Sequence, residues 1–247
     1  MVKALRTLLF AATLIGCALP AAAADAPPEP AAIPVAEPAA VEPVFVRQRR
    51  FHLSGYLSHW VNSNLPPFLY NAATGKLTFA DSYFAAVGGA AVVVPRFDLI
   101  LPGTSFGLRG NSIEIEAQGV KHFGLQDHVE GTIAAVVRSG EVPLFGGLSF
   151  NVAWGNGFSY AFSDPDYEKG PDSIRGVDTR RLQYYMGFEA EFTHASQPDI
   201  HLVAKLHHRS GIYGVISPQR TGSNYIGAGI RFDFPTSGRS ASLRDDP

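Results

Sequence analysis

The stretch RRLQYYMGFEAEFT, residues 180–193, alternates apolar and polar side chains over most of its length. Its even positions are apolar: Leu182, Tyr184, Met186, Phe188, Ala190 and Phe192. Its odd positions include the polar residues Arg181, Gln183, Glu189 and Glu191. Because successive side chains of a β-strand point to opposite faces, the two sets lie on opposite sides of one strand. The stretch therefore predicts a strand with one apolar face and one charged face.

Seven further segments repeat this strand-like pattern, and turn-rich stretches separate them. Together with the first, the segments are residues 51–62, 82–94, 112–122, 128–139, 147–160, 180–193, 200–210 and 223–234. Most contain about 11 residues, which is the length that a tilted strand needs to cross a bilayer. The fold class predicted from them is all-β, an eight-stranded antiparallel transmembrane β-barrel that occupies residues 50–234.

The polar face of these segments carries charges of both signs. Its charged members are Glu114, Glu116, Glu130, Arg138, Glu189, Glu191, Lys205, Arg209 and Arg231. Such a mixture suits a narrow lumen closed by ion pairs, with the apolar faces turned to lipid. A soluble lipocalin-like barrel alternates in the same way with the two sides reversed, so the sequence leaves that alternative open.

The N-terminal region reads as an export signal followed by a linker. Residues 1–24 combine Lys3 and Arg6 with an apolar run and a small-residue cleavage site, which is typical of a signal peptide. A lipoprotein-type cleavage before Cys17, the only cysteine, is the alternative. Residues 25–49 are rich in Pro and Ala and predict a disordered linker, and residues 235–247 predict a polar C-terminal tail. Export and a barrel together predict the outer membrane of a Gram-negative cell.

The net charge of the chain argues against a nucleic-acid-binding protein. The net charge of −2 gives no basic field that would favour nucleic acid, so no nucleic-acid partner is expected.

Phe234 closes an aromatic-rich segment and resembles the end signal of outer-membrane barrels, which implies the barrel assembly machinery as a partner. With eight strands and both ends on the periplasmic side, the long connections 63–81, 161–179 and 211–222 face outward. The long connection 95–111 then becomes a periplasmic turn.

Three polar residues interrupt the apolar face near its outer end. His208 and Ser210 are two residues apart, and Asn224 has the same outward parity on the next segment. Polar side chains on a lipid-facing surface are costly, so this cluster predicts a function. A histidine activates a serine hydroxyl within hydrogen-bond reach, and an amide can orient the ring or stabilise an oxyanion. Solvated rim residues beyond the hydrocarbon band are the structural alternative.

The His-x-Ser motif that ends the seventh segment resembles the lipid A 3-O-deacylases, and more loosely the acyloxyacyl hydrolase-like barrels. The similarity also includes Glu116, HFG at 122–124, His128, Glu130 and GNGFSY at 155–160. The resemblance implies an outer-membrane esterase that removes an acyl chain from lipid A or a related outer-leaflet lipid, so lipopolysaccharide is the implied partner. It implies His208 as the base, Ser210 as the nucleophile and Asn224 as an oxyanion or orienting group.

One feature departs from that family. Its acidic triad member lies downstream of the serine, whereas no glutamate follows Ser210 here. Activity supported by Asn224 and loss of activity therefore both stay open. The alternatives are a non-catalytic structural or adhesive barrel and a soluble periplasmic barrel that carries a lipid. No cofactor is predicted, and no metal site either, because the histidines at 52, 59, 122, 128 and 194 lack convincing metal-ligand spacing.

Overall fold

The computed structural model describes residues 49–100, 102–104, 107–168, 179–219 and 221–235. The predicted signal peptide, nearly all of the predicted linker and nearly all of the C-terminal tail lie outside these residues. The strands are β1 (Arg49–Val61), β2 (Phe79–Ile100), β3 (Gly107–Gly124), β4 (Val129–Arg138), β5 (Val142–Pro143), β6 (Leu148–Ala161), β7 (Leu182–His194), β8 (Gln197–Ser210) and β9 (Gly222–Pro235). A short helix α1 (Phe68–Ala73) and a 3₁₀ turn η1 (Asp166–Glu168) lie between strands.

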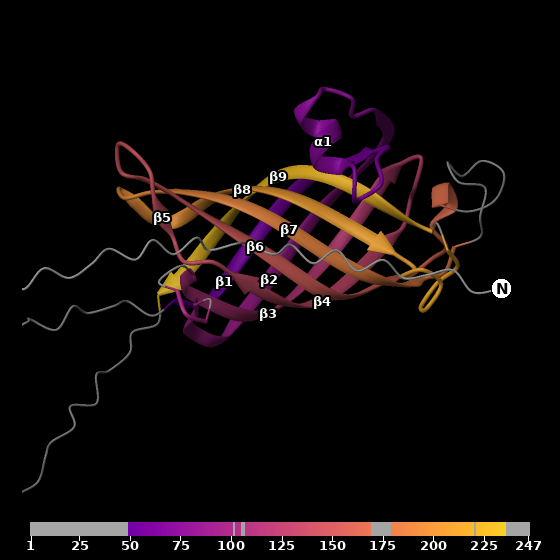
Figure 1. Ribbon diagram of the computed structural model, residues 1–247. Coiled ribbons are helices and arrows are strands. Elements are labelled where there is room, and N and C mark those ends of the chain that lie inside the picture. Colours follow the sequence, from indigo (N-terminus) through magenta and orange to yellow (C-terminus); the bar gives the residue numbers. More distant parts are fainter. Residues whose placement is uncertain (1–48, 101, 105–106, 169–178, 220, 236–247) are drawn as a thin grey trace, which may run out of the picture. The chain divides into compact units, whose positions relative to one another are not determined.

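Eight of these strands close into a ring. Each long strand pairs antiparallel with its neighbours in chain order, β1 pairs with β9, and β4 pairs with β6 to complete the circle (Figure 1). The two-residue β5 only extends the edge of β6. Closure leaves no free sheet edge around the ring, which is the condition for a sheet that lies in lipid. The predicted eight-stranded antiparallel barrel is confirmed.

The two faces of the wall have opposite polarity. Leu57 and Leu202 point outward and are 67% and 62% exposed, whereas Glu130 and Glu191 point into the lumen and are fully buried. A soluble barrel would place these residues the other way round. An apolar outer surface around a charged interior is the arrangement of an outer-membrane barrel, so the predicted localisation follows from the wall itself.

One predicted turn is mostly strand. Residues 95–111 were expected to form a periplasmic turn, but β2 continues to Ile100 and β3 begins at Gly107. Phe97 pairs with Asn111 and Leu99 with Leu108, with register shifts on both sides of Phe97. Proline cannot donate to a sheet ladder, so strands that contain it tend to carry such irregularities, and Pro95 lies beside one here. The remaining predicted strands are correct to within a few residues at each end.

Within the described ranges, no helix has the length and apolar character needed to cross a membrane. The only regular α-helix described is the six-residue α1, which lies outside the wall of the barrel near β8 and β9 (Figure 1).

Candidate functional site

The predicted polar cluster lies where β8 and β9 reach their outer ends. His208 is paired with Asn224 in the strand register, and Ser210 is paired with Gly222. The neighbours of His208 on β8 enter the lumen, where His207 contacts Glu130 and Arg209 contacts Glu168. Because side chains alternate along a strand, His208 and Ser210 lie on the outer face of the wall. Both are partly buried there, and Asn224 is only 2% exposed.

His208 and Asn224 are joined by a hydrogen bond. Nδ1 of His208 lies 2.5 Å from Oδ1 of Asn224, and Nδ2 of Asn224 donates to the backbone carbonyl of Ser63. A carbonyl only accepts, so the amide nitrogen must face Ser63 and the amide oxygen must face the ring. Nδ1 of His208 is then the donor, which leaves Nε2 as the basic nitrogen. The arrangement fixes the tautomer that a general base for a hydroxyl group requires.

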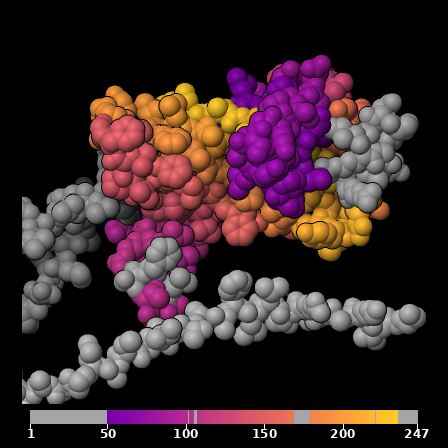
Figure 2. Space-filling view, turned by 45° about the horizontal axis from the view of Figure 1, so that its top comes forward, coloured from indigo at the N-terminus to yellow at the C-terminus, as the bar shows by residue number. Residues whose placement is uncertain are grey.

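The first outer loop covers this part of the wall. Val61, Phe68 and Leu206 form a buried apolar cluster, and Phe188 and Ile226 pack against it. Leu206 and Ile226 belong to the outward face of β8 and β9, so α1 and its flanking loop lie on the outside of the barrel rather than over its mouth. Figure 2 shows this purple segment standing out from the wall. This cover was not predicted from the sequence, and it shields Asn224 from lipid.

The chain bends sharply just after Ser210. Ile212 and Tyr213 have φ values of +44° and +52°, in the left-handed region that non-glycine residues seldom occupy. Strained backbone of this kind clusters at functional sites. Tyr213 is 90% exposed and Val215 is 79% exposed, so the turn presents apolar side chains beside the serine.

The acidic residues nearest to Ser210 along the chain and on the adjoining strands point into the lumen. Glu189 and Glu191 point into the lumen and bind Arg138, as their parity predicted. Asp233 is also luminal and lies 3.2 Å from His201. The amide of Asn224 contacts the ring of His208, as the asparagine does in the Cys-His-Asn variants of nucleophilic triads.

A shallow apolar groove of about 450 Å³ runs along the same outer wall over β1, β2 and β9. Gly55, Ala85 and Ala228 form its floor, and Leu57 and Phe232 are among its sides. Ala228 lies four residues beyond Asn224 on the outward face of β9, which is about 13 Å along the strand. The groove is thus within one acyl-chain length of the polar cluster.

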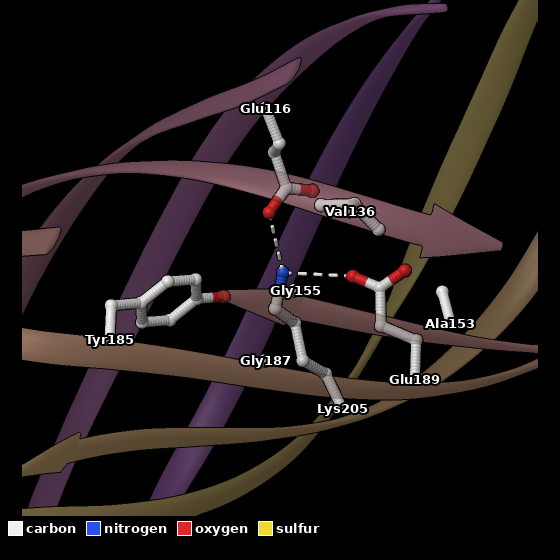
Figure 3. Close-up of a pocket in the computed structure, with 8 residues that line it drawn as sticks. All are labelled: Glu116, Val136, Ala153, Gly155, Tyr185, Gly187, Glu189 and Lys205. Atoms are coloured by element: carbon white, nitrogen blue, oxygen red, sulfur yellow. Dashed lines mark hydrogen bonds and ion pairs between the residues drawn. The ribbon is translucent and has the colours of Figure 1, made fainter. Parts of the chain in front are cut away.

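The centre of the lumen is filled by ion pairs. Nζ of Lys205 lies 3.2 Å from Glu116 and 2.8 Å from Glu189, and the Tyr185 hydroxyl points toward the same place (Figure 3). The space that these side chains line holds no room for a water molecule. Arg138 completes the network with contacts to Glu189 and to two further carboxylate groups, those of Glu114 and Glu191. The lumen is therefore packed at this level.

A second luminal cluster was missed by the sequence reasoning. His122, His128 and Glu130 come together at the outer end of β3 and β4. Burial, followed by the neighbouring His122, lowers the pKa of His128 to about 3, so its imidazole is neutral. The signal that would have found this cluster is the hairpin register: the loop after His122 places His128 opposite it and Glu130 two residues further on the same face.

Comparisons with known proteins find folds but no relatives. No family model matches the chain, and no curated protein matches it. Among solved structures, the outer membrane enzyme PagL is similar, with 9% identity, a TM-score of 0.42, and coverage of 75% of this chain and 99% of that one. Neisserial surface protein A (NspA) has 12% identity, a TM-score of 0.41, and coverage of 74% and 97%. Ail, the attachment invasion locus protein of Yersinia pestis, has 13% identity, a TM-score of 0.19, and coverage of 75% and 99%.

Proposed function

We propose that this outer-membrane barrel is an esterase that removes an acyl chain from lipid A or a related outer-leaflet lipid. The observation that carries the proposal is the 2.5 Å contact between His208 Nδ1 and Asn224 Oδ1 on the outer wall, two residues from Ser210. The barrel does not need polar residues on this face for its stability, since lipid-facing positions favour apolar side chains. An oriented histidine beside a serine is the arrangement that nucleophilic catalysis requires.

The reaction follows from the tautomer. Nε2 of His208 takes the proton of Ser210 Oγ as that oxygen attacks the ester carbonyl, which gives an acyl-enzyme after the C–O bond of the ester breaks. The imidazolium returns the proton to the leaving alcohol oxygen. Water, deprotonated by the same nitrogen, then attacks the acyl carbon, and the imidazolium gives that proton to Ser210 Oγ as the Oγ–C bond breaks and the fatty acid leaves. Asn224 acts as a positioning residue that holds the ring, and Ser63 holds Asn224.

The location of the cluster agrees with a lipid substrate. It lies at the outer ends of β8 and β9, where the ester linkages of outer-leaflet lipid meet the headgroup region, and the apolar groove over β1, β2 and β9 extends toward the middle of the wall. An acyl chain bound in that groove lies alongside the other acyl chains of the leaflet, so the substrate reaches Ser210 laterally from the bilayer.

The test is mass spectrometry of lipid A from cells that express the wild-type chain or Ser210→Ala, with heat-modifiable migration on gels to show that both barrels are folded. We expect the wild type to release one acyl chain per lipid and Ser210→Ala to release none. His208→Ala is expected to lose at least about 1,000-fold in rate, because the triad acts as a unit.

The matched control is Ser223→Ala. Ser223 is adjacent to Asn224 on β9 but faces the lumen, so its removal should leave the acyl pattern of the wild type. An unchanged acyl pattern for folded wild type, or equal activity in Ser210→Ala, contradicts the esterase. Purified protein incubated with lipid A and, separately, with a diacyl phospholipid then identifies which lipid class is cut.

The second candidate is a non-catalytic barrel whose outer loops bind a partner. The observation that favours it is the apolar surface of those loops, where Leu69, Tyr70, Tyr213 and Val215 are all exposed. Replacement of Tyr213 and Val215 by serine then abolishes adhesion of expressing cells to a host-cell surface and leaves lipid A unchanged.

A further inference from the structure

Three metal-binding side chains meet where the outer hairpin of β3 and β4 turns. His122 is on β3, His128 directly precedes β4, and Glu130 is the second residue of β4. The backbone N–H of His122 donates to the carbonyl of His128 at 2.9 Å, so the two residues face each other across the hairpin. One ligand atom from each of the three side chains lies within 4.8 Å of the others.

Within the described part of the chain, the imidazole of His128 is buried without a polar partner for its ring nitrogens. It is 2% exposed, and neither of its ring nitrogens has a hydrogen-bond partner among the residues that the structure describes. The ring stacks on that of His122 with centroids 4.1 Å apart and an interplanar angle of 12°, a contact that satisfies neither nitrogen. A buried imidazole without partners is costly, and a bound cation that accepts a nitrogen lone pair removes that cost.

The other two side chains already have the outer contacts that metal ligands use. Oε1 of Glu130 accepts hydrogen bonds from Ser159 at 2.7 Å and from His207 at 3.0 Å. Oε2 lies 2.8 Å from Nε2 of His122, and an ion would bind between these two atoms in place of their shared proton. Nδ1 of His122 lies 3.2 Å from the Tyr225 hydroxyl. Such contacts fix the orientation of a ligand and its tautomer.

The local charge balance also favours a cation. Arg209 lies 3.8 Å from Glu130 and 3.3 Å from Glu168, so one guanidinium faces two buried carboxylate groups. A divalent ion at this point would add positive charge beside these two carboxylates, which share one guanidinium.

We propose that His122, His128 and Glu130 bind one zinc ion at the outer end of the lumen. Two imidazoles and a carboxylate, completed by water, form a donor set that zinc takes in proteins. The lone pairs of parallel rings do not converge, so binding turns one ring out of the stack. The proton on His122 Nε2, now shared with Glu130 at 2.8 Å, moves to Nδ1 and faces Tyr225. The ion ties the outer hairpin together and does not depend on the esterase.

The test is titration of the folded, detergent-solubilised chain, made without a histidine tag, with Zn²⁺ in competition with a chromophoric chelator. We expect one zinc per chain with a Kd below about 1 μM, and a loss of at least about 100-fold in His128→Ala, whose loop position leaves the strands intact. Co²⁺ in place of zinc should show the visible absorption of a tetrahedral site, and this absorption should vanish in His128→Ala.

The matched control is His194→Ala, which removes an exposed histidine at the opposite end of the barrel. Its zinc affinity and stoichiometry should equal those of the wild type. Three outcomes overturn the proposal: a wild-type Kd above about 100 μM, equal zinc affinity in His128→Ala, or an equal loss in His194→Ala, which would show adventitious surface binding.

Discussion

The lumen and the outer wall both bury polar side chains, and they do so in different ways. In the lumen, Arg138 and Lys205 are surrounded by carboxylate groups contributed by several strands. On the outer wall, His208 and Asn224 contact each other and are covered by the first outer loop. Each luminal cation is paired with luminal carboxylates, so the charges of the interior neutralise one another. The outer cluster is separate from that network, and Asn224 binds the carbonyl of Ser63 in the loop that covers it.

The largest loss of stability is expected when the centre of the luminal network is disrupted. Arg138 lies within 3.0 Å of Glu114, 3.0 Å of Glu189 and 2.5 Å of Glu191. Arg138→Met leaves these carboxylates buried without their cation, and we expect a loss of about 3–5 kcal/mol in the free energy of unfolding. Guanidinium unfolding in detergent micelles, followed by tryptophan fluorescence, measures this loss.

Arg181→Met is the control for that experiment. Arg181 forms an ion pair with Asp164 at 2.8 Å, but both side chains are about half exposed. Solvent screens such a pair, so the unfolding midpoint should not move. Equal midpoints for Arg138→Met and Arg181→Met would show that the luminal network does not hold the barrel together.

A charge placed on the lipid-facing side should lower the free energy of unfolding by a somewhat smaller amount. Ile133 lies in the middle of β4 and is 56% exposed on the outer wall. We expect Ile133→Arg to lower the unfolding free energy in lipid vesicles by about 2–4 kcal/mol, because the guanidinium must enter the hydrocarbon layer. Leu69→Arg in α1 is the matched control and should shift it by less than about 0.5 kcal/mol, since that side chain lies outside the strands. Similar shifts for the two variants would contradict the inside-out wall.

The smallest effect on stability is expected where the loop meets the wall. Phe68 is buried against Leu206, whereas its neighbour Leu69 is exposed. Phe68→Ala removes that contact and should detach the loop as a local unit, with less than about 1 kcal/mol lost from the unfolding of the whole barrel. Limited chymotrypsin digestion should cut the loop at Leu69 or Tyr70 at least about fivefold faster than in the wild type. Leu69→Ala is the control and should leave the docking of the loop unchanged. If the loop loosens in Leu69→Ala but not in Phe68→Ala, Phe68 does not anchor it.

The sequence predicted the barrel wall better than it predicted the covering loop and the buried histidine cluster. Period-2 alternation in residues 180–193 and its counterparts was enough for strand number, polarity and the luminal direction of Glu189 and Glu191. The pairing of His208 with Asn224 followed from the same parity, because the two strands are neighbours in the chain. The cover formed by α1 could not be predicted, since its docking depends on the curved surface that β8 and β9 create only after closure. The His122 cluster required the exact hairpin register, which alternation alone does not give.

The packed middle of the lumen has an electrical consequence. Lys205, Glu116 and Glu189 interlock across the barrel and leave no water-sized gap between them. Ions therefore have no wet path from one side of the membrane to the other, and a single molecule inserted in a planar lipid bilayer should stay silent under an applied voltage. A steady conductance in that recording would show that the Lys205 layer opens in the membrane.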